Sequence, residues 1–185
     1  MQKLEIKLEG PFLLAPVVRG DERGFLVETY RRSMLEELGI EELIQDNHSR
    51  SRCGIVRGMH FQPRQAKLVR CVRGEIFDVI VDIRPGSPQF GEWEGFRLDD
   101  VDHYQLYIPD GFAHGFCVLS ELADVIYKIS SYYDPQAEMG FAFDDPEVGI
   151  EWPAASELVA SERDRSAPRL AELKPRLVFD YQVHA

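Results

Sequence analysis

The chain of 185 residues has only three cysteines, Cys53, Cys71 and Cys117, and no CxxC pair. Three scattered thiols are too few for a disulfide framework, and a metal knuckle or a thiol-redox motif would need paired cysteines. Long hydrophobic runs are also lacking: none reaches membrane-spanning length, and none near the start is long enough for a signal peptide. These features lead us to expect a cytoplasmic protein without a membrane segment.

Positive charge is scarce overall, since 21 Lys and Arg stand against 32 Asp and Glu and give a formal net charge of −11. This balance argues against nucleic acid or a membrane surface as partners. Residues 47–74 are the exception, because they hold no Asp or Glu but contain Arg50, Arg52, Arg57, Arg64, Lys67, Arg70 and Arg73. A basic stretch in an acidic protein indicates a local anion site. The alternative is a basic edge strand that discourages aggregation.

Hydrophobic residues make up 44% of the chain and aromatic residues 11%, so we expect a folded single domain over residues 1–185. Short apolar runs recur between turn signals, a pattern typical of an all-β sandwich or barrel. The expected strands are 12–16, 25–29, 43–46, 55–61, 67–72, 75–83, 93–98, 105–108, 114–119 and 124–132. Ser33 and Glu36 have capping-box spacing, which predicts a short helix over 33–38 that ends at Gly39. Ser161 can cap a second short helix, and the tail is expected to pack outside the barrel.

Arg57 and His60 lie three residues apart, so a regular strand would place them on opposite faces. Gly58 lies between them, and a glycine in a strand often marks a bulge. We therefore expect a bulge at Gly58 that brings both side chains to one site.

His60 lies between Met59 and Phe61 in the basic stretch and can serve as a ligand, a base or a core residue. The metal pattern of cupin barrels needs His-x-His followed by a Glu, but here Gln62 takes the second position and no acid follows it until Glu75. The second half of that pattern, Pro-x-Gly-x-x-His, is present and ends at His114. The scaffold therefore looks like a cupin with too few ligands for a catalytic metal, and we expect none.

As a general base, His60 would need an orienting carboxylate and a cation that stabilises charge on the substrate. Lys67 or Arg57 can supply the cation, and the spacing does not choose among the carboxylates Asp78, Asp82, Asp124 and Asp164. A proton donor can come from Tyr132 or Tyr133, although paired tyrosines at a strand end are also common edge packing. His48 and His103 are expected in polar, solvated turns.

Eight sequence segments together resemble one known family. They are GDERGFLVETY, QDNHSRS, GIVRGMHFQ, KLVRCVRGEIFDVIVDIR, SPQFGEW, IPDGFAHGF, YKISSYYDP and SERDR. In this order they are similar to the dTDP-4-dehydrorhamnose 3,5-epimerases, from about Pro16 to Arg165. The resemblance implies an all-β cupin-type jelly roll with a few short helices. It also implies epimerisation of dTDP-4-keto-6-deoxyglucose at C3 and C5 by proton abstraction next to the C4 ketone, with no cofactor.

The resemblance also implies roles for individual residues. His60 matches the general base, Asp164 its paired carboxylate, Tyr133 the general acid and Lys67 the lysine near the C4 carbonyl. The positions that match nucleotide-sugar contacts are Arg23, Glu28, Gln45, Asn47, Arg57, His114, Glu138 and Arg163. Arg163 stands where Lys is commoner. The family is expected to form homodimers in which Glu28 reaches the nucleotide of the partner subunit.

The connection from His60 to Lys67 is shorter here than in family members that insert residues after FQ. It lies beside the expected site, so a single-centre epimerase (at C3 or C5), or one that uses another nucleotide, remains an alternative. A metal-dependent cupin oxygenase and a non-catalytic sugar-nucleotide binder are further alternatives. Isotope exchange into the substrate distinguishes the binder, and chelator sensitivity distinguishes the oxygenase.

Overall fold

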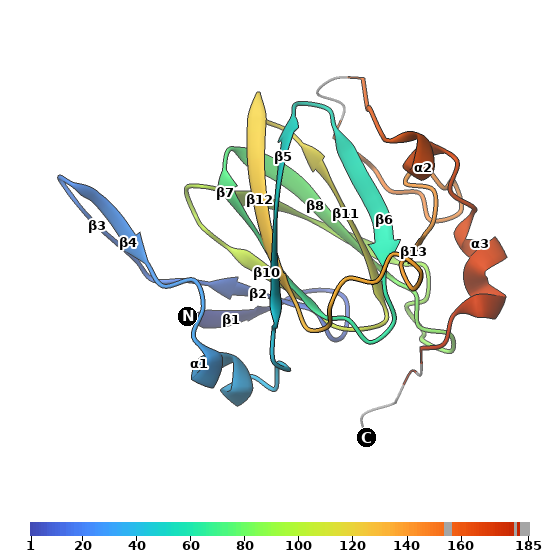
Figure 1. Ribbon diagram of the computed structural model, residues 1–185, viewed down its shortest axis with the longest axis horizontal. Helices are drawn as coiled ribbons and strands as arrows, with labels where there is room; N and C mark the ends of the chain where they lie inside the picture. Colours follow the sequence, from blue (N-terminus) through green and yellow to red (C-terminus); the bar gives the residue numbers. More distant parts are fainter. Residues whose placement is uncertain (154–156, 180, 182–185) are drawn as a thin grey trace.

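The computed structural model describes residues 1–153, 157–179 and 181. It contains two facing β-sheets that form a barrel-like sandwich (Figure 1). The six-stranded sheet has the order β1-β2-β10-β7-β12-β5, and its strands are β1 (Gln2–Glu5), β2 (Phe12–Ala15), β10 (Gln105–Ile108), β7 (Lys67–Arg73), β12 (Leu122–Ile129) and β5 (Gln45–Arg52). The five-stranded sheet has the order β13-β6-β11-β8-β9, and its strands are β13 (Met139–Gly140), β6 (Val56–Phe61), β11 (Phe112–Val118), β8 (Glu75–Asp82) and β9 (Trp93–Asp99).

The main core lies between these sheets. Strand β11 is buried along its whole length, and β8 is buried from Asp78 onward. Their inward side chains, such as Ile76, Ile80 and Phe116, pack with Val69 and Leu106 of the opposite sheet. Burial of large aliphatic and aromatic side chains contributes roughly 1.5–3 kcal/mol each, so this layer holds the two walls of the fold at a fixed separation.

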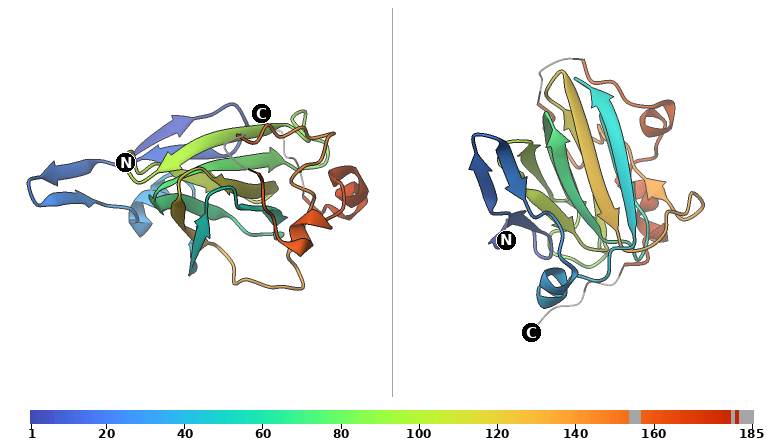
Figure 2. Two further views of the ribbon diagram at one scale, coloured as in Figure 1. Left: turned by 90° about the horizontal axis from the view of Figure 1, so that it is seen from above. Right: turned by 60° about the vertical axis from the view of Figure 1, so that its left-hand side comes forward.

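The strands β3 (Val18–Asp21) and β4 (Gly24–Val27) form a separate hairpin. This hairpin extends away from the two sheets (Figures 1 and 2). Its large apolar side chains Phe25 and Leu26 are 59% and 73% exposed. A projecting hairpin with exposed apolar residues resembles a contact surface more than a folded core element.

The helices are short: α1 (Arg32–Glu37), α2 (Glu162–Arg165), α3 (Leu170–Leu173) and the 3-10 turn η1 (Lys174–Arg176). The expected capping box of α1 is wrong, because Arg31 precedes the helix without a side-chain cap and Ser33 already lies inside it. The expected cap of the second helix is correct: Ser161 accepts a hydrogen bond from the backbone N–H of Asp164. The segment that follows packs on the five-stranded sheet, where Leu173 and Leu177 meet Phe61 and Val81.

The all-β prediction is confirmed, and most expected strands lie within a few residues of the observed ones. Three expectations need correction. The strand expected at 43–46 is observed as β5, which begins at Gln45 and continues to Arg52, so it carries His48 on a strand instead of a turn. β12 ends at Ile129, before the paired tyrosines. His103 is only 6% exposed, and its ring packs at a tilt against Phe25 of the hairpin, so it is not solvated as expected. The sequence also failed to predict β1, β3, β13 and α3.

The bulge expected at Gly58 is present. Across β6 and β11, His60 pairs with His114 and Arg57 with Phe116, so three steps on one strand match two on the other. Gly58 has φ +137°, and an added Cβ would lie 2.5 Å from the Cα of Gly115. Only glycine fits this backbone and this close approach without strain. The result is that Arg57 and His60 point into the same cavity.

Candidate active site

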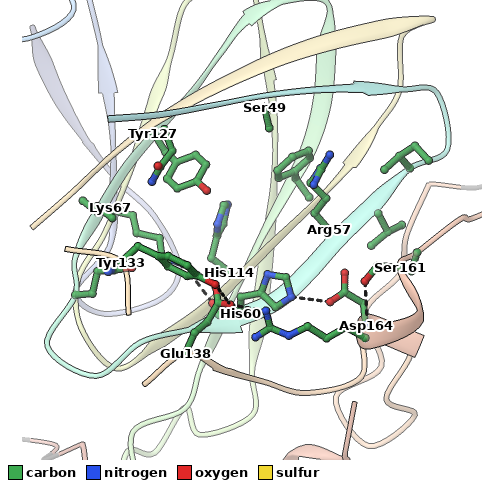
Figure 3. Close-up of a pocket in the computed structure, with 18 of the residues that line it drawn as sticks. Ser49, Arg57, His60, Lys67, His114, Tyr127, Tyr133, Glu138, Ser161 and Asp164 are labelled. Atoms are coloured by element: carbon green, nitrogen blue, oxygen red, sulfur yellow. Dashed lines mark hydrogen bonds and ion pairs between the residues drawn. The ribbon is translucent and has the colours of Figure 1, made fainter. Parts of the chain in front are cut away.

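A cavity of about 660 Å³ lies between the two sheets. One wall carries Arg57 and His60 of β6 and His114 of β11, and the facing wall carries Lys67 of β7 and Tyr127 of β12 (Figure 3). The predicted site residues that line it are Asn47, Arg57, His60, Lys67, His114, Tyr133, Glu138, Arg163 and Asp164. The fold therefore gathers residues from positions 47 to 164 around one space.

His60 and Asp164 form a hydrogen-bonded pair, with 2.7 Å between Nε2 and Oδ1. Asp164 stands at the third position of α2, where the Ser161 cap fixes the helix against β6. Burial alone would raise the pKa of Asp164, but hydrogen bonds from His60, Ser161 and the Gly58 backbone outweigh it and lower that pKa. Asp164 is therefore a carboxylate at neutral pH and orients the imidazole.

The other three carboxylates considered for this task have different partners. Asp78 contacts His114 at 2.9 Å, and Asp124 accepts hydrogen bonds from Arg50 and His48. Asp82 bonds Arg84 and Ser87 beyond the cavity. The choice that the spacing left open is thus decided by α2, a distant part of the chain.

Lys67 extends into the cavity and donates to the backbone carbonyl of His60 at 3.4 Å. Burial lowers the pKa of Lys67 to about 8, while the negative charges of Glu138 and Asp78 counteract the shift. Lys67 is therefore still mostly protonated at pH 7. A buried cation that extends into a cavity is well suited to stabilise an oxyanion.

Tyr133 lies at the cavity mouth and donates to Glu138 at 3.1 Å, and Glu138 forms an ion pair with Arg163 at 2.6 Å. The turn that carries Tyr133 is held by Gln62, whose amide contacts Ser131, the carbonyl of Tyr132 and the N–H of Asp134. Tyr132 is 72% exposed and does not line the cavity. Tyr133 is therefore the one of this pair that lies at the site, as expected.

Sequence reasoning missed Tyr127, whose hydroxyl points into the cavity from β12 (Figure 3). Burial and the charge of Glu138 raise its pKa, against a smaller opposing effect of Arg57. Tyr127 shares strand parity with Val125 and Ile129, both buried apolar residues. That alternation was the available signal that Tyr127 faces inward.

Further polar groups lie along β5 and β6 beside the cavity. Gln45 donates to Asn47 and accepts from the N–H of Tyr133, and Arg57 donates to Ser51. Ser49, which sequence reasoning also missed, lines the cavity, and its buried Oγ has no hydrogen-bond partner within the described part of the chain. Buried hydroxyls are normally satisfied, so a ligand is a natural partner for this one.

Three expected binding residues do not line this cavity: Gln45, which contacts the lining residues Asn47 and Tyr133, and Arg23 and Glu28. Arg23 is on the projecting hairpin and pairs with Asp21, and Glu28 follows the hairpin and pairs with Arg31. The hairpin extends away from the two sheets that enclose the cavity (Figure 1).

Among residues 1–153, 157–179 and 181, no group of three or more His, Cys, Asp or Glu side chains is placed to hold a metal ion. The same residues include no helix that is long and apolar enough to cross a membrane.

Comparisons with known proteins agree with this geometry. A family model described as dTDP-4-dehydrorhamnose 3,5-epimerase matches residues 5–172. The enzyme of that name from Salmonella typhimurium is 48% identical over 163 residues, which cover 85% of this chain and 89% of the relative. The dTDP-4-dehydrorhamnose 3-epimerase of Streptomyces niveus is 44% identical over 179 residues, which cover 94% and 86%.

A solved structure from Legionella pneumophila, a dTDP-6-deoxy-D-glucose-3,5-epimerase in complex with dTDP-4-keto-L-rhamnose, is similar with a TM-score of 0.95 and 41% identity. The match covers 98% of this chain and 99% of that one. The chain folds as a cupin-like jelly roll, and it belongs to the dTDP-4-dehydrorhamnose 3,5-epimerase family.

Proposed function

We propose that this protein converts dTDP-4-keto-6-deoxyglucose to dTDP-4-keto-L-rhamnose by inverting C3 and C5. The observation that carries the proposal is the His60–Asp164 pair, which faces Lys67 and a phenol across a cavity of about 660 Å³. Both C3 and C5 protons are α to the C4 ketone, so their removal gives an enolate. The reaction needs only proton transfers and a stabilised oxyanion, which side chains can supply without a cofactor.

His60 removes the proton in this mechanism. Asp164 accepts a hydrogen bond from the ring and keeps the other nitrogen unprotonated toward the substrate. Lys67 donates to the C4 oxygen as negative charge develops there. A positioned base contributes typically ~10²–10⁴-fold to the rate.

The new proton must arrive at the opposite face of the sugar. The resemblance assigns this step to Tyr133, whose hydroxyl already donates to Glu138 at the half-exposed mouth. A second candidate, Tyr127, is favoured by its place: it lies on the six-stranded sheet, opposite His60 on the five-stranded sheet. A planar enolate held between the sheets would have the base on one face and Tyr127 on the other. We therefore propose Tyr127 as the acid and Tyr133 as a binding residue at the mouth.

The nucleotide part is proposed to bind along the polar side of the same cavity. Arg57 and Arg163 supply positive charge for a diphosphate, and Arg forms bidentate contacts that Lys does not. The remaining contacts are proposed for Gln45, Asn47, His114 and Glu138.

Arg23 and Glu28 are proposed to act across a homodimer. They lie on or beside the hairpin that projects with exposed Phe25 and Leu26, so a second copy would both cover the apolar surface and receive the polar side chains. Light scattering at micromolar concentration should give a dimer mass, and Leu26→Asp should shift it toward the monomer. A monomer mass for the wild type would reject the dimer.

We also propose a cytoplasmic location, consistent with the small number of cysteines.

A single-centre epimerase is the second candidate, because the Streptomyces niveus relative is named a 3-epimerase. Incubation with dTDP-4-keto-6-deoxyglucose in deuterated water, followed by NMR, separates the two. Deuterium at both C3 and C5, together with the L-configured product, supports the proposal. Deuterium and inversion at one carbon alone would establish the single-centre enzyme, and no exchange at all would reject both.

A further inference from the structure

The cavity wall that carries His60 contains a second imidazole–carboxylate pair. His114 Nε2 lies 3.0 and 2.9 Å from the two carboxylate oxygens of Asp78. Asp78 is completely buried, and His114 is 7% exposed. His114 is also the direct cross-strand partner of His60. Two imidazoles therefore lie side by side, each bound to its own carboxylate, and Asp78 has no role so far.

Asp78 does not line the cavity, yet its charge reaches Lys67. The groups that face Lys67 come from several elements: the carbonyl of His60 on β6, His114 on β11, Tyr127 on β12 and Glu138 before β13. Asp78 on β8 and Glu138 are the carboxylates whose charges support the lysine against burial. Asp78 thus influences both His114 and the cation on the opposite wall.

We propose that Asp78 is a positioning residue of this reaction: it fixes His114 as a hydrogen-bond acceptor for a sugar hydroxyl and balances the charge of Lys67. The proposal rests on the proposed function for its substrate. A carboxylate only accepts hydrogen bonds, so the proton of a neutral His114 must stand on Nε2. Nδ1 then carries the free lone pair and can accept from a hydroxyl beside the reacting carbon.

Asp78→Asn changes both effects without changing the size of the side chain. An amide can donate to Nε2, which would move the imidazole proton to Nδ1 and turn the acceptor into a donor. Loss of the negative charge also lowers the pKa of Lys67 further below about 8, because burial then acts with less compensation. The alkaline limb of activity should move to lower pH.

Asp82→Asn is a matched control. Asp82 is on the same strand and is equally buried, but its partners Arg84 and Ser87 lie outside the cavity. It should lower thermal stability through the lost buried contacts and leave the catalytic pH profile unchanged.

The first arm of the test needs no substrate. Histidine ¹⁵N NMR of the unliganded wild type, with His114→Gln to identify the signals, should show the Nε2-protonated tautomer of His114. Asp78→Asn should reduce or reverse that tautomer, whereas Asp82→Asn should retain it. A wild-type His114 protonated on Nδ1 would overturn the proposal even if Asp78→Asn failed to fold.

The second arm is the pH dependence of kcat/KM. Asp78→Asn should move the alkaline limb by about one pH unit toward acid, as expected for the loss of one nearby charge, and Asp82→Asn should not move it. An unchanged limb in Asp78→Asn, or an equal shift in both variants, would overturn the proposal. If the wild type itself does not turn over, the proposed substrate is wrong, and the NMR arm still decides the role of Asp78.

Discussion

The two walls of the cavity differ in the chemistry that they carry. The five-stranded wall holds two imidazoles, His60 and His114, with their carboxylates. The six-stranded wall holds the buried cation Lys67, the phenol of Tyr127 and the hydroxyl of Ser49. The imidazoles therefore face the cavity's amine and phenol, while Arg57 is a cation on the imidazole wall.

This division explains how one site can invert a carbon. A base and an acid on the same wall would remove and return the proton on one face of the sugar, which restores the original configuration. Separate sheets hold the two groups on opposite faces, and the core between the sheets fixes their separation. Each variant below removes or moves part of one wall.

The largest effect is expected from the base wall. His60→Asn should lower kcat by ~10²–10⁴-fold, the usual contribution of a positioned base. It should also abolish deuterium uptake into the substrate, while dTDP still binds. Stopped-time NMR and calorimetric binding of dTDP measure the two quantities. His48→Asn is the control, since this side chain is 54% exposed on β5 and lies outside the cavity. Normal exchange in His60→Asn would contradict the assignment.

On the opposite wall, Lys67→Met should lower kcat/KM by about 10²–10³-fold, comparable with the loss of one oxyanion donor. The reaction needs the protonated amine, and the pKa of Lys67 is about 8. Wild-type kcat/KM should therefore fall as the pH rises above 8, and this fall should be absent in Lys67→Met. A wild-type profile that stays flat to pH 9.5 would show that the charge of Lys67 is not required.

A smaller effect is expected from a change in the bulge that joins Arg57 and His60 on one wall. Gly58→Ala should destabilise the protein by ~1–3 kcal/mol and lower kcat/KM, because the new Cβ would lie 2.5 Å from Gly115. Gly91→Ala is the control: Gly91 also has a positive φ, +81°, but nothing lies within 4 Å of its added Cβ. The melting temperature of Gly58→Ala should be clearly lower than that of Gly91→Ala. Equal melting temperatures would reject the steric argument.

Much of the five-stranded wall could be predicted from the sequence. The alternation along residues 75–83, the position of His60 among cations and the bulge at Gly58 all rest on local backbone rules. The pairing of His60 with Asp164 was available only through the family resemblance. The two residues are far apart in the chain, and their contact depends on how α2 packs against β6.

The six-stranded wall was predicted less well, and the reasons are physical. The sequence predicts a strand over 124–132 and therefore draws attention to Tyr132 and Tyr133 at its end, but β12 ends at Ile129 and both tyrosines follow it in a segment held by Gln62. Within β12, the alternation of inward and outward side chains places Tyr127 on the same face as the buried Val125 and Ile129, and this indicates that Tyr127 faces the cavity. β5 was shortened because its alternating polar residues face solvent on an edge strand and the cavity on the other side, so no apolar period marked it.

The most direct test of the two-wall account compares Tyr127→Phe with Tyr133→Phe in deuterated water. NMR records deuterium at C3 and C5 and the amount of L-configured product in the same sample. The account predicts that Tyr127→Phe still takes up deuterium, because His60 and Lys67 remain, but forms little inverted product. Tyr133→Phe should epimerise, with weaker nucleotide-sugar binding at most. Normal inversion by Tyr127→Phe together with its loss in Tyr133→Phe would contradict the account and make Tyr133 the acid, and normal inversion by both variants would leave neither phenol in that role.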